Sequence, residues 1–134
     1  MCTFIFFQID GYIPTGQTVV IIVQIETKTE GFSLVHFDNR VVVDFDRRLV
    51  FRDDSEIPLT KTEFDILIYL YQNRNHVLSF TQIYEHVWGE PDYGTGQGTV
   101  GHHVRSLKRK LQVSQKGKWQ IRSVRGIGYC FEIK

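Results

Sequence analysis

The sequence predicts an α+β fold with an N-terminal antiparallel sheet, three helices and a C-terminal β-hairpin. Three observations carry this prediction. Short apolar runs separated by turn residues fill much of the first 60 positions, two capping boxes then open helical segments, and a Gly-rich turn divides two strand-like runs near the end. With 134 residues, of which 42% are hydrophobic, the chain can form one domain with an appendage.

The first half of the chain is predicted to be β-structure. Residues 3–9 and 18–26 are rich in Phe, Val and Ile and flank a segment with turn chemistry. Shorter strands are expected at residues 32–37, 40–45, 47–51 and 56–59. We assign residues 1–31 to a β-rich extension of unknown role and residues 32–134 to the domain. The extension could be an added hairpin on the first sheet, a dimer contact or a remnant upstream of the domain.

Two capping boxes mark where helices begin. In Thr60-Lys61-Thr62-Glu63 and in Ser79-Phe80-Thr81-Gln82, the first hydroxyl can accept from the N3 amide while the last side chain reaches back to the N-cap amide. Apolar residues follow each box at helical spacing, and the first helix is expected to end at residues 73–75. A loop with four glycines, residues 89–98, then leads to a third helix that is expected to begin at Thr99.

The third predicted helix has one apolar face and one basic, polar face. Val100, Val104, Leu107 and Leu111 recur at the spacing of a single helical face. The remaining face carries His102, His103, Arg105, Ser106, Lys108, Arg109 and Lys110. From residue 98 onward the chain has nine Lys or Arg residues against one acidic residue, although its net charge is only +1. This segregation of charge indicates that the C-terminal part faces a polyanion.

The order of these elements is that of a helix-turn-helix followed by a wing. The strands of the wing are expected at residues 119–124 and 129–133, around Arg125-Gly126-Ile127-Gly128. The chain resembles the OmpR/PhoB-type winged-helix DNA-binding domain of bacterial response regulators. The matching stretches are residues 59–67, 87–89, 103–111 and 124–129, and the resemblance covers roughly residues 32–133.

The resemblance implies a transcriptional regulator that binds double-stranded DNA in a sequence-specific way. His102, His103 and Ser106 are candidates for reading base edges, while Arg105, Lys108 and Arg109 are candidates for clamping phosphates. Lys110 is expected to be a solvated charge. In the wing, Ser123 and Arg125 are expected on one strand face, and the resemblance implies that Arg125 enters the minor groove.

The resemblance also suggests a protein partner. The loop after the second helix lies where family members contact RNA polymerase, so Glu90, Asp92 and Tyr93 are candidates for that contact. A flexible connector is an equally acceptable interpretation of this loop. A homodimer on DNA is left open as well.

The chain departs from the pattern of the family in three places. Ser106 stands where an arginine often occurs, so the base preference of relatives cannot be transferred. Gly98 and Gly101 weaken the third helix by roughly 1 kcal/mol each, so its start is expected to fray in the absence of DNA. Residues 1–31 are too short for a receiver domain, and phosphorylation of this chain is not the expected switch.

Other classes of protein are less well supported. A winged helix can instead be a protein–protein interaction module, but the basic face of the third helix argues against this. We find no nucleophile–base pair, phosphate loop or metal-ligand spacing, so neither an enzyme nor a cofactor is expected. The two cysteines, Cys2 and Cys130, and the absence of a signal peptide or a long apolar run fit a cytoplasmic protein that does not enter a membrane.

Overall fold

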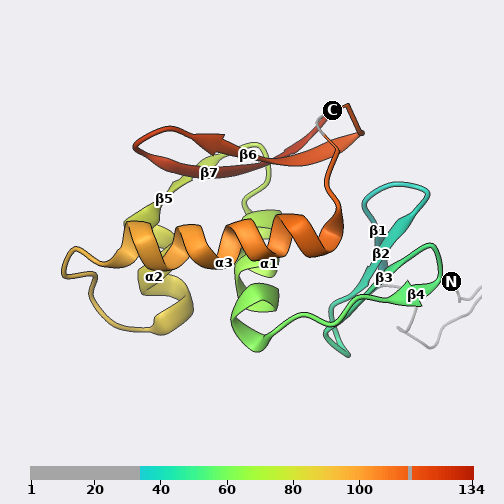
Figure 1. Cartoon of the computed structure of the whole chain (residues 1–134), viewed down its shortest axis with the longest axis horizontal. Helices are drawn as coiled ribbons and strands as arrows, with labels where there is room; N and C mark the ends of the chain where they lie inside the picture. Colours follow the sequence, from blue (N-terminus) through green and yellow to red (C-terminus); the bar gives the residue numbers. More distant parts are fainter. Residues whose placement is uncertain (1–33, 115) are drawn as a thin grey trace, which may run out of the picture. The chain divides into compact units, whose positions relative to one another are not determined.

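The computed structural model describes residues 34–114 and 116–134 (Figure 1). The chain divides into two compact units, residues 1–35 and 36–134, and the description below concerns the second unit. The predicted strands at residues 3–9 and 18–26 lie outside the described residues. The elements in chain order are β1 (Leu34–His36), β2 (Val41–Asp44), β3 (Leu49–Arg52), β4 (Ser55–Glu56), α1 (Lys61–Gln72), β5 (Val77–Ser79), α2 (Phe80–Trp88), α3 (Gly96–Leu111), β6 (Trp119–Val124) and β7 (Gly128–Ile133). The predicted α+β fold is confirmed.

The first sheet has the strand order β1-β2-β3-β4, with β2, β3 and β4 paired as antiparallel neighbours. The strand expected at residues 56–59 is wrong, because β4 ends at Glu56. Pro58 has no backbone N–H to offer a neighbouring strand. Ile57 still donates its amide to the carbonyl of Val50 at 2.7 Å, and residues 57–60 then lead directly into α1.

Both capping boxes form as predicted. The Thr60 hydroxyl accepts from the Glu63 amide at 3.1 Å, and the Glu63 carboxylate accepts from the Thr60 amide at 2.9 Å. Ser79 and Gln82 repeat the arrangement at the start of α2. The first helix ends at Gln72 with Asn73 as its C-cap, as expected, and Gly89 caps α2 in the left-handed conformation.

The third helix begins earlier than predicted, at Gly96 instead of Thr99. The N-cap residue, Thr95, forms no side-chain cap hydrogen bond. The Asp92 carboxylate takes this role from the loop, accepting from the amides of Gly94 at 2.8 Å and Gly96 at 2.9 Å. A Cβ atom on residue 96 would lie 2.3 Å from the Asp92 Oδ2, so the cap requires glycine at this position.

The C-terminal hairpin belongs to a three-stranded sheet with the order β5-β7-β6. The sequence prediction missed β5, whose three residues stand directly before the capping box of α2. Val77, Leu78 and Ser79 pair with Cys130, Tyr129 and Gly128 of β7. The approach is close, because a Cβ atom on residue 128 would lie 1.8 Å from the Leu78 carbonyl oxygen. This sheet therefore ties the hairpin to the start of α2.

The core lies where the three helices meet the two sheets. The apolar face of α3 is fully buried, and Phe37, Tyr71, Trp119 and Phe131 form an aromatic cluster with ring centroids 4.9–5.5 Å apart. Cys130 is buried as a free thiol. Figure 1 shows α3 crossing the face of the domain, in front of α1 and alongside the β6–β7 hairpin. None of the helices in the described part of the chain is long and apolar enough to cross a membrane.

Candidate nucleic-acid interface

The outer face of α3 is the feature around which the site is built. His102, Arg105 and Arg109 are exposed, and their spacing of three and four residues puts them on one side of the helix. The opposite side, with Val100 and Leu107, is completely buried. The amphipathic pattern predicted from the sequence is confirmed, and it leaves a row of polar side chains facing solvent.

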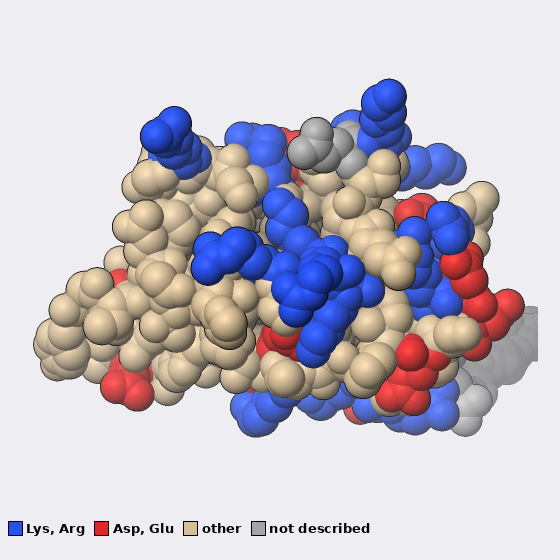
Figure 2. Space-filling model, in the orientation of Figure 1, with Lys and Arg blue, Asp and Glu red and all other residues tan. Residues whose placement is uncertain are grey.

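Two groups of cations in the domain differ in whether a carboxylate neutralises them. In residues 34–114 and 116–134, six of them form an ion pair with a carboxylate at 2.5–2.8 Å: Arg40, Arg47, Arg48, Lys61, Lys110 and Arg122. Arg105, Lys108, Arg109 and Arg125 have no acidic partner among these residues. Figure 2 shows Lys and Arg side chains gathered over the middle of the face that α3 crosses. The positive charge of this face is thus not neutralised within the domain.

Gly101 lets two neighbouring side chains approach α3 closely. A Cβ atom there would lie 3.2 Å from an Arg105 guanidinium nitrogen and 3.5 Å from the Tyr129 hydroxyl. Arg105 therefore lies back along the helix towards the hairpin. Burial raises the pKa of Tyr129, an effect that the positive charge of Arg105 partly offsets.

His103 is placed differently from His102. It is half-buried, its ring centroid lies 5.5 Å from that of Trp88, and Trp88 in turn stacks on Tyr84 at 4.9 Å. Burial and the neighbouring His102 lower the pKa of His103, so its imidazole is neutral at physiological pH. Of the two histidines, His102 has the open position and His103 packs against α2.

Ser106 and Lys110 both lie towards a buried carboxylate. The Lys110 Nζ is 2.7 Å from the Glu63 Oε1, and the Ser106 hydroxyl also hydrogen-bonds to Glu63. The expectation that Lys110 is a solvated charge is therefore wrong. Sequence reasoning gave Glu63 a capping role only, because nothing in the local pattern shows that residues 63 and 110 meet.

Lys108 lies on the other flank of α3, beside the edge strand β6. Together with Val113, Ile121 and Ser123 it lines a hollow of about 300 Å³ that also touches Gln120 and Arg122. Ser123 is exposed, whereas Arg122 pairs with Glu132 across the hairpin. The hollow thus brings the helix and the wing together around an unpaired ammonium group.

Arg125 is exposed in the tight turn between β6 and β7. The turn is closed by the Ile127 amide, which donates to the Val124 carbonyl at 2.9 Å, and Gly126 adopts a φ of +74°. The Phe80 amide donates to the Ile127 carbonyl at 3.0 Å and holds the turn against the start of α2. The argument that Ser123 and Arg125 share a strand face is wrong, because β6 ends at Val124.

The three predicted polymerase-contact residues in the loop before α3 have different surroundings. Tyr93 is 87% exposed and Glu90 is exposed too. Asp92 instead caps α3, and hydrogen bonds from the amides of Gly94 and Gly96 lower the pKa of its carboxyl group. In the described residues, no three His, Cys, Asp or Glu side chains are grouped to hold a metal ion.

Comparison with known proteins identifies the family. The family model described as "Transcriptional regulatory protein, C terminal" matches residues 54–131. The chain belongs to this family. The matched residues run from the end of the first sheet to β7 and so include all three helices and the whole turn of the hairpin.

Individual members of the family show the same relationship. The response regulator ArlR of Staphylococcus epidermidis is 41% identical over 93 residues, which cover 68% of this chain and 41% of ArlR. The chain thus spans about two fifths of the length of this relative. Among solved structures, the DNA-binding domain of Bacillus subtilis CssR is 30% identical with a TM-score of 0.59, covering 68% of this chain and 98% of that one. The DNA-binding domain of E. coli CpxR is 25% identical with a TM-score of 0.64, covering 75% of this chain and 96% of that one. The OmpR/PhoB-type winged helix expected from the sequence is confirmed.

Proposed function

We propose that this member of the family binds double-stranded DNA at specific sequences and regulates transcription. The observation that carries the proposal is the set of four cations on α3 and the wing that have no acidic partner in the described residues, whereas Arg40, Arg48, Lys61 and Arg122 are each paired with a carboxylate. Phosphate neutralisation by such side chains supplies most of the affinity of a protein for DNA. The relatives point the same way, since CssR and CpxR are represented by DNA-binding domains.

In this proposal the outer row of α3 lies in the major groove. His102 can donate to or accept from base edges, while Arg105 and Arg109 reach either a guanine edge or the phosphates that flank it. Lys108 and Ser123 line the hollow between helix and wing, where a backbone phosphate fits against the ammonium group. Arg125 then enters the adjoining minor groove, where narrow A·T-rich sequence attracts a guanidinium group. Ser106 and His103 are weaker base readers, since each is half-buried against another helix.

A second partner is proposed for the loop before α3. Tyr93 and Glu90 are exposed on this loop, where Asp92 accepts from the amides of Gly94 and Gly96, so both side chains are available for a contact with RNA polymerase. A homodimer on paired half-sites is compatible with this assignment. The alternative of a protein–protein interaction module is less well supported, because α3 presents an uncovered and positively charged face.

The test is a selection of bound sequences from random duplex DNA with the full chain. We expect one enriched motif, with a spaced repeat if a dimer binds. The Arg105→Ala/Arg109→Ala double variant should lose the enrichment while keeping its thermal transition. Recovery of random sequence by the unmodified protein would overturn the proposal. An unchanged motif in the double variant would show that the bases are read by residues outside α3.

A further inference from the structure

The carboxylate of Glu63, which caps α1, has contacts that a helix cap does not need. Its side chain is 3% exposed, yet it accepts from the Thr60 amide at 2.9 Å, from the Lys110 ammonium at 2.7 Å and from the Ser106 hydroxyl. A capping box needs only the first of these hydrogen bonds. The other two come from α3, 43 and 47 residues further along the chain.

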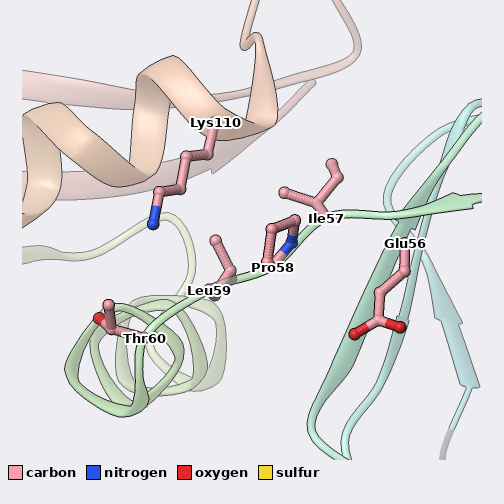
Figure 3. A pocket seen from close by; sticks show the side chains of 6 residues that line it. All are labelled: Glu56, Ile57, Pro58, Leu59, Thr60 and Lys110. Carbon is pink, nitrogen blue, oxygen red and sulfur yellow. The ribbon is translucent and has the colours of Figure 1, made fainter.

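Both partners on α3 belong to its polar face. Ser106 lies one residue after the exposed Arg105, and Lys110 lies one residue after the exposed Arg109. The Ser106 hydroxyl still touches the outer row, because it accepts from the Arg109 guanidinium at 3.4 Å. Without its partner on α1, Lys110 would flank the same row. Figure 3 shows Lys110 extending from α3 towards the chain at the start of α1, close to Leu59 and Thr60.

We infer that Glu63 is a positioning residue of the DNA interface, which draws Lys110 away from the outer row of α3 and so determines which cations meet DNA. The inference rests on the proposed DNA binding and makes it more specific. With Glu63 in place, α3 offers His102, Arg105 and Arg109 to the duplex. The Lys110 ammonium, if it joined this row, would add affinity for any phosphate backbone without adding any reading of bases.

The surroundings allow Lys110 to move once its partner is removed. Its side chain is still 31% exposed. It borders an open hollow of about 510 Å³, whose other lining residues are Glu56, Ile57, Pro58, Leu59 and Thr60. A flexible four-carbon stem next to solvent can turn outwards, whereas a sealed lysine could not.

The inference is tested by the salt dependence of DNA binding in four full-length proteins: unmodified, Glu63→Gln, Lys110→Gln and the double variant. Each neutralised phosphate changes the slope of log K against log salt by about 0.9. We expect Glu63→Gln to steepen the slope by about that amount on random duplex DNA. We also expect the ratio of its affinity for the selected sequence to its affinity for random duplex to decrease. Lys110→Gln and the double variant should keep the unmodified slope, because the lysine is either engaged or absent.

Two outcomes overturn the inference. A Glu63→Gln protein that is folded by circular dichroism and has the unmodified slope would show that the carboxylate is a structural cap only. A shallower slope in Lys110→Gln would show that Lys110 already contacts DNA. Arg105→Gln is the control for DNA binding itself. If the domain binds DNA through α3, this variant should have a flatter slope, whatever the result for Glu63→Gln.

A second measurement covers the case in which Glu63→Gln does not fold. Side-chain NMR signals of the lysines are followed in the unmodified protein while duplex DNA is added. We expect the Lys108 ammonium signals to shift and those of Lys110 to stay in place. Shifts of similar size at both lysines would overturn the inference.

Discussion

Arg125 is the side chain whose proposed role is most local. It is exposed beside a glycine with positive φ, in a turn that two backbone hydrogen bonds hold in place. We predict that Arg125→Ala weakens binding to the best site by about 1–3 kcal/mol and relaxes the preference beside the major-groove half-site. Arg125→Lys should restore part of the affinity but less of the A·T preference, because the ammonium group is more strongly hydrated. Quantitative binding to duplexes that differ only in the flanking sequence checks this, and unchanged binding by Arg125→Ala would exclude the wing from the interface.

The lowered pKa of Glu63 leads to a prediction about the stability of the domain in acid, which does not depend on DNA. Burial alone would raise its pKa, but hydrogen bonds from Lys110, Ser106 and the Thr60 amide outweigh burial and lower the pKa from 4.5 to about 2. A carboxylate with a lowered pKa stabilises the fold above its unfolded pKa, and this contribution is lost as the pH falls from 4.5 towards 2. The full contribution is about 3 kcal/mol at most. Urea unfolding between pH 5.5 and 2 should therefore show a smaller loss of stability for Glu63→Gln than for the unmodified protein. The exposed Glu56→Gln serves as control, and equal losses in both variants would contradict the prediction.

At the scale of elements, Gly98 of α3 and Gly128 of β7 have different surroundings. A Cβ atom on residue 98 meets nothing within 4 Å, whereas one on residue 128, in β7, would collide with the Leu78 carbonyl. Gly98→Ala should raise the free energy of unfolding by about 1 kcal/mol, because alanine loses less conformational freedom in a helix. Gly128→Ala should destabilise the domain by disrupting the pairing of β5 with β7. Thermal unfolding of both variants checks the pair, and a loss of stability in Gly98→Ala would contradict the open surroundings.

The same elements show which parts of the fold a sequence can predict. Both capping boxes were predicted to the residue, since all their hydrogen bonds join residues within one helical turn. The start of α3 was missed because its cap comes from Asp92 in the loop and not from the N-cap residue. Strand β5 was missed because its three residues become a strand only through β7, about 50 residues later. For the site, the outer row of α3 followed from helical periodicity, whereas the pairing of Lys110 with Glu63 depends on how two helices pack.

At the scale of the whole molecule, the composition of the N-terminal extension, residues 1–31, leads to a separate prediction. Its apolar runs are expected to need a partner, either a sheet edge or another chain. We predict that deletion of residues 1–28 lowers solubility or changes the oligomeric state, while the winged helix keeps its thermal transition. Sedimentation and thermal unfolding of the two proteins check this. Identical behaviour in both measurements would mean that the extension is only a tail.

The distribution of ion pairs over the molecule leads to the last prediction. Arg40 and Arg48 are bound to Asp53 and Asp65, whereas Arg105 has no acidic partner in the described residues. A cation that is already neutralised releases no counterion on binding DNA, while a free one releases about one counterion per phosphate. We therefore predict that Arg105→Ala reduces the slope of log K against log salt by about 0.9, and that Arg40→Ala leaves the slope unchanged. Titrations between 50 and about 200 mM salt on the selected duplex measure both slopes. Equal flattening in the two variants would show that DNA is held by the net charge of the domain, in which case the row of free cations on α3 would not define the interface.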